Sequence, residues 1–168
     1  MPCRSPQSTS LKSVRFVALA FLAVLVCAAS LSTARAAGQG SPLHRIAVDN
    51  DRGKMEWTVE LASDPSSRSR GLMFRKTMPA DQGMLFRFET VRPVTMWMAN
   101  TFIPLDMIFI AESGEIAHIH RNAVPRSRDI ISSRIPVRYV LELNAGSVER
   151  AGLAIGQIMR HPWFSIGQ

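Results

Sequence analysis

The amino-acid sequence predicts a mainly β fold, a single domain built as a sandwich or barrel with two short helices. Two observations lead to this prediction. Several short segments alternate apolar and polar residues, as half-buried strands do, and turn residues recur about every dozen positions between them. The chain also lacks an internal repeat, a low-complexity tract and any sign of a second domain.

Residues 1–36 have the order of a secretory signal peptide. Lys12 and Arg15 precede an apolar run over residues 17–31, which is shorter than the roughly 20 residues that span a bilayer. The sequence Ala-Arg-Ala at 34–36 then forms a small-x-small cleavage signal. We therefore expect cleavage after Ala36 and an exported protein, periplasmic or secreted, without an integral membrane span. An uncleaved anchor is the alternative.

Cysteine and charge exclude several classes of function. Cys3 and Cys27 both lie in the leader, so the mature chain has no disulfide, thiolate metal site or cysteine nucleophile. The whole chain carries a formal charge of +7, but four of its 20 basic residues lie in the leader. The mature chain keeps 16 basic and 13 acidic residues, a net charge of +3, without a run of five like charges. We expect no nucleic-acid partner, and a monomer.

The first half of the mature chain predicts strands around one short helix. Residues 37–48 are expected to be a flexible start, and residues 49–168 the single β-rich domain. Residues 55–62 alternate as a half-buried strand does. Asp64 as N-cap and Pro65 at the first helical position then predict a helix through Leu72. A loop over residues 77–83 separates it from two more expected strands, at 84–88 and 94–98.

The second half predicts further strands and a single helical turn. A turn-rich connection at 100–104 precedes an apolar strand at 105–111 and a hairpin turn at 112–115. A strand at 116–120 follows, and then the polar segment 122–136, whose two prolines predict irregular structure. The remaining expected elements are a strand at 137–143, a turn at 144–146, a helical turn at 147–152 capped by Ser147, and a last short strand at 157–160.

Five groups of residues carry a family resemblance. They are Arg68-x-x-Gly71-Leu72-Met73-x-Arg75; Gly83-Met84-Leu85-Phe86; Trp97-Met98-x-Asn100-Thr101-x-Ile103-Pro104-Leu105-Asp106; Gly114 with Ile116; and Leu141-Glu142-x-x-x-Gly146 with Gly152 and Gly156. In this order they resemble the uncharacterised family catalogued as domain of unknown function 192, over roughly residues 49–160. The resemblance implies a small, often exported, jelly-roll-like β-sandwich or barrel. It implies no general biochemical activity.

Asp106 is the first candidate for a functional side chain. It shares one face of its expected strand with Ile108 and Ile110, and a carboxylate on an apolar face needs a partner. Arg68, Arg70 and Arg75 are possible partners, as is a turn amide near Asn100. Asp106 is then either a ligand-gripping or acid–base group, or a structural residue that accepts backbone N–H bonds and stabilises the turn at 100–104. The structural interpretation is favoured.

Glu142 is the second candidate carboxylate. It is expected on the strand face of Arg138 and Val140, where a solvated or cross-strand charge is the simpler interpretation. Together with Asp106 it could form the two-carboxylate site of a hydrolase acting on envelope carbohydrate. That alternative requires a defined separation of the two carboxyl groups on one side of the sheet.

Methionine and histidine suggest a third possibility, a periplasmic protein that binds copper or a divalent metal through these side chains. Eight methionines lie after the leader, and thioethers are soft ligands for Cu(I). Met96 and Met98 flank Trp97, but on a strand the tryptophan would point the other way. His118 and His120 would share one face, yet no third ligand lies near them in the sequence. Core filling explains methionine more simply, so no metal site and no cofactor are predicted.

The preferred prediction is a non-enzymatic module that binds a small molecule or an envelope component. A turn-rich, polar and aromatic segment on a β scaffold supports it, together with the absence of a recognisable catalytic motif. No catalytic residue is assigned. The residues expected to line the binding site are Arg68, Arg75, Trp97, Asn100, Thr101, Asp106 and Glu142.

Overall fold

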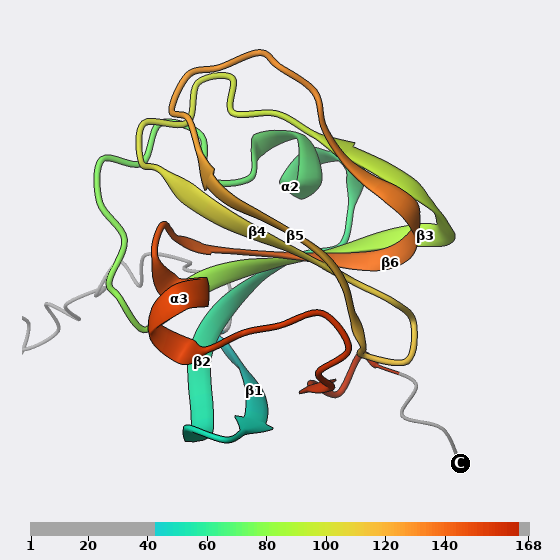
Figure 1. The fold of residues 1–168 in the computed structure, drawn as a ribbon. Helices are drawn as coiled ribbons and strands as arrows, with labels where there is room; N and C mark the ends of the chain where they lie inside the picture. The colour runs from blue at the N-terminus through green and yellow to red at the C-terminus, as the bar shows by residue number, and fades with distance from the viewer. Residues whose placement is uncertain (1–42, 165–168) are drawn as a thin grey trace, which may run out of the picture. The chain divides into compact units, whose positions relative to one another are not determined.

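The computed structural model describes residues 43–164, and the predicted leader and the start of residues 37–48 lie outside this range. The domain is mainly β with two short helices, as predicted (Figure 1). Its elements, in chain order, are β1 (His44–Asn50), β2 (Gly53–Ala62), α2 (Pro65–Arg70), β3 (Gln82–Met96), β4 (Leu105–Ile110), β5 (Ile116–Ala123), β6 (Ile131–Asn144), α3 (Ser147–Ala151) and β7 (Met159–Arg160).

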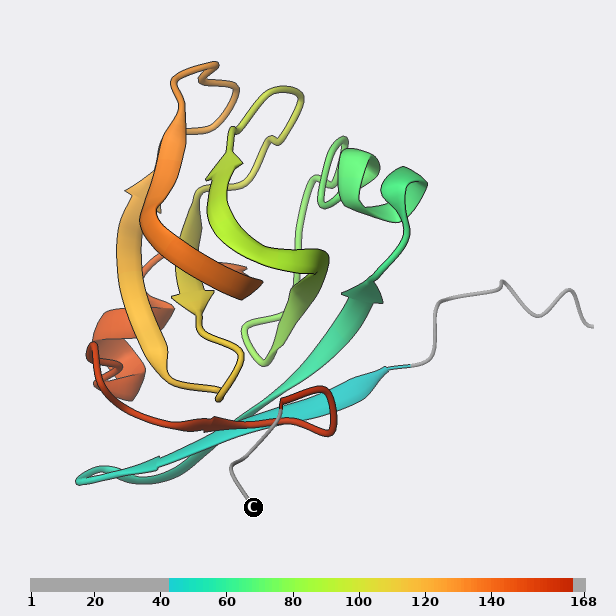
Figure 2. The same cartoon turned by 90° about the vertical axis from the view of Figure 1, so that its right-hand side faces the viewer.

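The seven strands form one sheet that curls on itself (Figure 2). Their order is β5-β4-β6-β3-β2-β1-β7, and only β2 and β3 pair in parallel. The crossover between these two strands contains α2, as a parallel connection requires. A single antiparallel bridge from Glu115 to Ile158 joins the two outer regions of the sheet. The sheet is therefore a curled half-barrel with its two edges linked at one point.

Two elements differ from the prediction because long strands bend. β3 is one strand of 15 residues, where two strands at 84–88 and 94–98 were expected. Its register with β6 shifts between Arg87 and Arg92 and again after Pro93, so irregular pairing carries the chain around the bend. β6 begins at Ile131, inside the segment expected to be irregular. Pro136 lies opposite Pro93 beside a register shift, a place where sheets accept proline.

The predicted flexible start was wrong over residues 44–48. β1 pairs with β2 on one side and β7 on the other. Ile46 and Val48 are fully buried, Ala47 between them is half-buried, and Arg45 and Asp49 on either side are exposed. The alternation is that of a strand, but only two large apolar residues mark it.

The hydrophobic core has two parts, one on each face of the central strands. Ile108, Ile110 and Leu141 contribute to a cluster that includes α3. Met107, Phe109 and Val140 contribute to a second cluster, which includes Leu72 beyond the end of α2. β4 and β6 are thus buried on both faces, and a polar side chain on either face lies inside the protein. Within residues 43–164, no helix is long and apolar enough to cross a membrane.

Candidate functional site

A cavity of about 540 Å³ opens between α2, the bent strand β3, β6 and the loops that follow β3 and β5. Aromatic and aliphatic side chains form most of its wall, and this composition is typical of small-molecule sites. The cavity is lined by Pro65, Arg68, Ser69, Arg70, Gly71, Leu72, Met73, Phe86, Phe88, Thr95, Met96, Trp97, Thr101, Arg128, Ile130 and Glu142.

Glu142 is the buried acidic residue of this cavity. It lies in β6 opposite Met84 of β3 and Met107 of β4, and its side chain is 4% exposed. Burial raises its pKa to about 8, so the carboxyl group is mostly protonated at neutral pH. Among residues 43–164 its carboxyl group forms no hydrogen bond or ion pair, and its oxygens are not among the side-chain atoms sealed from solvent, so they face the cavity. The cavity is therefore the place where this group can meet a partner.

Arginines surround the outer part of the cavity, but they are not equivalent. The Arg68 guanidinium donates to the carbonyl oxygens of Ser63 (2.6 Å) and Arg87 (3.1 Å) and pairs with Glu89. These contacts of Arg68 connect α2 to β3. Arg70 and Arg128 are exposed, and within the described part of the chain neither forms an ion pair. These two guanidinium groups are available to an anionic group at the entrance.

Four of the seven predicted site residues line the cavity: Arg68, Trp97, Thr101 and Glu142. Trp97 follows the end of β3 and is 60% exposed at the entrance. Thr101 is buried, and its backbone is held on both sides because its N–H donates to Met98 and its carbonyl accepts from Arg126. Of the predicted residues in the segment 97–106, Trp97 and Thr101 therefore line the cavity, and Asn100 and Asp106 do not.

Arg75 and Asn100 do not line the cavity. Arg75 forms a two-pronged ion pair with Glu60 of β2, with N–O distances of 2.5 and 2.6 Å. Asn100 has a positive φ of 58° in its turn, and its carbonyl oxygen accepts a hydrogen bond from the Phe74 N–H at 2.8 Å. Both residues fix the loops around the cavity without lining it.

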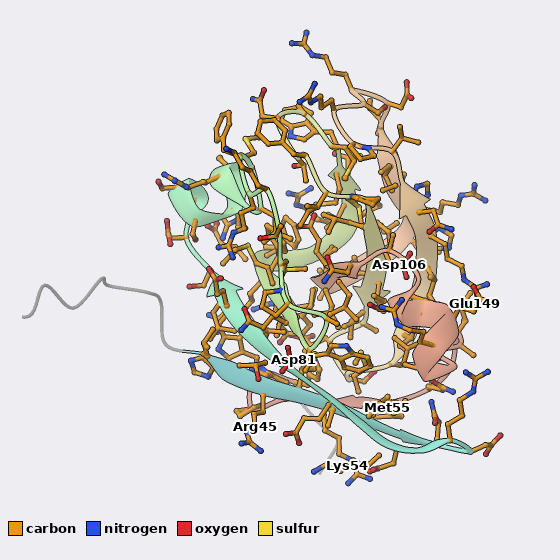
Figure 3. All side chains as sticks on the ribbon, turned by 90° about the vertical axis from the view of Figure 1, so that its left-hand side faces the viewer. Arg45, Lys54, Met55, Asp81, Asp106 and Glu149 are labelled. Carbon is orange, nitrogen blue, oxygen red and sulfur yellow. The ribbon has the colours of Figure 1, made fainter. Side chains whose placement is uncertain are left out.

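Asp106 is a structural residue on the other face of the sheet. It is fully buried, and its two oxygens accept from the backbone N–H groups of Asn122 and Val148, each at 2.9 Å. Figure 3 shows it beside the helix that carries Glu149. The favoured interpretation, acceptance of backbone N–H bonds, is confirmed, but the partners are neither arginines nor the turn at 100–104. Asp106 instead connects β4 to the end of β5 and to α3.

The two-carboxylate hydrolase site was wrong. Asp106 pairs in register with Leu143, and Glu142 pairs with Met107, so the two carboxyl groups leave the sheet on opposite faces. Leu143 belongs to the cluster on the α3 side, and Met107 belongs to the other cluster. No substrate bond can lie between two groups that a packed sheet separates.

The metal hypothesis gains no support from the placement of its residues. Within residues 43–164 there is no group of three His, Cys, Asp or Glu side chains that could hold a metal ion. The His118 ring stacks on Phe109 at 5.6 Å. Met84, Met98, Met107 and Met159 are buried in the core, as the core-filling interpretation requires. Met73 and Met96 line the cavity, and Trp97 lines it as well.

Sequence reasoning missed several residues that form the cavity, notably Arg70, Phe86, Phe88 and Arg128. It also placed Glu142 on a solvated face. One signal could have corrected this: residues 139–143 are almost continuously apolar, as in a strand buried on both faces. A glutamate within such a run has no exposed face to occupy.

Comparisons with known proteins agree with the fold and give no activity. Residues 47–161 match the model of the DUF192 family, described as uncharacterized ACR, COG1430. A crystal structure from Sinorhizobium meliloti 1021, provisionally described as a transcription regulator, is 52% identical with a TM-score of 0.70, over 74% of this chain and 98% of that one.

A second crystal structure is of a protein of unknown function from Novosphingobium aromaticivorans DSM 12444. It is 31% identical with a TM-score of 0.70, and the match covers 74% of this chain and 89% of that one. No curated protein matches the chain. The family model covers most of the chain and nearly all of the described domain, and on this basis the chain belongs to the uncharacterised DUF192 family.

Proposed function

We propose that the domain is a binding module for a compact organic anion with an apolar body, which occupies the cavity at Glu142. The observation that carries this proposal is a buried carboxyl group that no residue of the described domain satisfies and that lines an apolar cavity. A buried polar group without a partner costs folding free energy. A cost of this kind is typical of a position kept for a ligand.

Glu142 constrains the inner end of the ligand. A neutral carboxyl group offers one O–H donor, so the matching group is a hydrogen-bond acceptor such as a carbonyl or ether oxygen. The Met84 and Met107 side chains beside Glu142 are buried and apolar. They exclude water from this hydrogen bond, which is stronger in a medium of low dielectric constant.

The entrance constrains the outer end of the ligand. Arg70 and Arg128 are exposed, lack ion-pair partners within the described residues, and lie where a carboxylate, sulfonate or phosphate could reach them. Between the two ends, Phe86, Phe88 and Leu72 favour an aromatic or aliphatic body. The volume of about 540 Å³ suits a small molecule rather than a polymer.

We further propose that this binding takes place outside the cytoplasm, with a ligand that is free or belongs to the cell envelope. The support is the leader order of residues 1–36 and the lack of cysteine after it. A domain without disulfides can function there because two hydrophobic clusters, one on each face of the sheet, stabilise it.

A dye that matches the proposed ligand tests this function. We expect 1-anilinonaphthalene-8-sulfonate to bind the mature chain with a saturable rise in fluorescence, since it combines an aromatic body with a sulfonate. Thr95 is an exposed strand residue that lines the cavity, so Thr95→Trp should fill the entrance and weaken binding by about tenfold. Thr90→Trp is the matched control, because Thr90 is exposed on the same strand but does not line the cavity.

Arg128→Gln should also weaken dye binding, since it removes a cation at the entrance. Equal affinities of the wild type, Thr95→Trp and Thr90→Trp proteins would mean that the dye binds elsewhere. A wild-type protein that binds neither this dye nor other aromatic sulfonates and carboxylates would overturn the proposed ligand class.

A further inference from the structure

We propose that the end of the domain around the cavity entrance docks on the surface of an anionic phospholipid bilayer. Three loops form this end: residues 71–81 between α2 and β3, residues 97–104 between β3 and β4, and residues 124–130 between β5 and β6. We call the exposed apolar side chains of these loops the docking rim. They are Phe74, Trp97, Phe102, Val124 and Ile130.

The five apolar side chains of the docking rim are all exposed to solvent. Phe74 is 58% exposed, Trp97 60%, Phe102 36%, Val124 66% and Ile130 73%. Half of the exposed large hydrophobic side chains that the structure describes lie in these three loops. Figure 2 shows the loops after β3 and β5 side by side, at the end opposite the β1–β2 hairpin. A gathering of exposed apolar side chains marks an interaction surface.

Hydrogen bonds join the three loops into one surface. The Phe74 N–H donates to the Asn100 carbonyl at 2.8 Å, which connects the first loop to the second. The Arg126 N–H donates to the Thr101 carbonyl at 3.0 Å, which connects the third loop to the second. The rings of Phe74 and Phe102 meet edge to face at 6.1 Å. The apolar side chains are thus held in place rather than presented on independent loops.

Each of the three loops also contains one residue with a strained backbone conformation. Phe74, Asn100 and Arg126 have positive φ angles of 64°, 58° and 62°, one residue in each loop. Only glycine adopts this region without cost, and asparagine tolerates it better than phenylalanine or arginine does. Each of the three strained residues takes part, through its N–H or carbonyl group, in one of the two bonds between the loops described above.

The charge of this end complements an anionic surface. Arg70, Lys76, Arg126 and Arg128 lie in or beside the three loops and form no ion pair within residues 43–164. The Arg126 guanidinium lies 4.9 Å from the Phe102 ring centre, so cation and aromatic ring are presented together. Asp129 is the single acidic residue of the loops 97–104 and 124–130.

At the other end of the domain, formed by β1, β2 and β7, basic side chains form ion pairs. Arg45 and Lys54 both pair with Glu56, at 2.8 and 3.1 Å, and Arg160 pairs with Asp49 at 3.1 Å. Figure 3 shows Arg45 and Lys54 near the β1–β2 hairpin, away from the three loops. Three basic side chains at this end therefore have an acidic partner, whereas the four basic side chains of the three-loop end have none among the described residues.

A bilayer fits this combination better than a nucleic acid does. Exposed aromatic and aliphatic side chains among arginines enter the boundary between headgroups and acyl chains, while the arginines bind lipid phosphates. Nucleic acid would use the arginines but not Val124 or Ile130. The helices α2 and α3, of six and five residues, are also too short to read a groove.

Sedimentation with vesicles tests the proposal on the mature chain, purified after removal of its leader. Vesicles of phosphatidylcholine with phosphatidylglycerol should carry the protein down, and phosphatidylcholine alone should carry much less. The double variant Phe74→Asn/Val124→Ser and the variant Arg126→Asn should each weaken binding by about tenfold or more. Asparagine is chosen because it accepts the positive φ of both positions.

None of these three residues lines the cavity, so the variants should keep their dye binding, which separates this proposal from the proposed function. Ile155→Ser is the matched control, because Ile155 is 61% exposed outside the three loops. Equal vesicle binding of the wild type and the rim variants would overturn the proposal. So would a wild-type protein that binds duplex DNA but not anionic vesicles.

Discussion

At the scale of single residues, Glu142 is the side chain whose environment conflicts most with its chemistry. Two register neighbours are buried methionines, and burial raises the pKa of the carboxyl group to about 8. A structural carboxylate would have acquired partners, as Asp106 has with two backbone N–H groups at 2.9 Å. The two residues show how a satisfied acid and an unsatisfied acid differ within one sheet.

The sign of the Glu142 pKa shift gives a prediction for Glu142→Gln. The folded protein holds a proton that the unfolded chain releases near pH 4.5, so this stability is complete below pH 4.5 and is lost as pH rises through about 8. Glutamine does not titrate. The free energy of unfolding of the variant minus that of the wild type should therefore increase as the pH rises from 4.5 to 8, by on the order of 4 kcal/mol in total.

Urea denaturation at several pH values measures this difference. Glu149→Gln is the control, because Glu149 is exposed on α3 and should show no such gain. A difference between Glu142→Gln and wild type that stays constant from acid to alkaline pH would mean that Glu142 titrates normally in the folded protein.

At the scale of secondary-structure elements, Asp106 joins three of them. Its carboxylate holds the end of β5 through Asn122 and the start of α3 through Val148. Asp106→Ala leaves a buried and a partly buried N–H without acceptors, so we expect a loss of about 2–5 kcal/mol in the free energy of unfolding. Urea denaturation measures the loss, and faster hydrogen exchange at the Val148 amide would localise it.

Dye binding distinguishes this structural role from a role in the site. Asp106→Ala should retain the affinity of the wild type for 1-anilinonaphthalene-8-sulfonate in conditions where it is folded, because Asp106 lies outside the cavity. A variant with unchanged stability and lost dye binding would instead make Asp106 a ligand-binding residue.

The elements that the sequence predicts well are those with strong local signals. Asp64 and Pro65 specify α2, and the Asp64 side chain accepts from the N–H groups of Ser66 and Ser67 as an N-cap should. The segment 105–110, apolar except for Asp106, forms β4, one residue shorter than the expected strand at 105–111. By contrast, β1 and the first part of β6 acquire their structure from partner strands. Pairing with β2 orders β1, and pairing with β3 orders residues 131–136 despite Pro136.

The cavity residues that the sequence predicts are likewise those that a local sequence signal marks. Trp97 and Thr101 could be predicted because they lie in one compact segment of the chain. The cavity also needs Arg70, Phe86 and Arg128, which were not predicted and which come from α2, β3 and a distant loop. Their meeting depends on the bend of β3 and on the central position of β6, and neither is encoded by local periodicity.

At the scale of the whole described domain, the two ends have different surfaces. The cavity and the docking rim share the end formed by the three loops, and the ion pairs of β1, β2 and β7 lie at the other. A ligand that enters between Arg70 and Arg128 would therefore enter from the surface that we propose to face lipid. An amphipathic anion of the envelope would first contact the docking rim and would then enter the cavity.

The proposal that the mature domain functions outside the cytoplasm gives the last prediction. The described fold starts at residue 43, so cleavage after Ala36 would leave every strand intact. We expect the chain, expressed with its leader in a Gram-negative host, to appear in the periplasmic fraction with Ala37 as its first residue. Mass spectrometry of the purified protein identifies that residue.

Two leader variants separate cleavage from mere export. Signal peptidase requires small residues at both ends of the Ala-Arg-Ala sequence, so Ala36→Phe should leave the precursor uncleaved and held at the membrane, whereas Arg35→Ala should be processed as wild type. A full-length chain in the cytoplasmic fraction would contradict export. Normal processing of Ala36→Phe would place the cleavage site elsewhere. Vesicle binding must be measured on processed protein, because the apolar residues 17–31 of a retained leader would bind lipid without the docking rim.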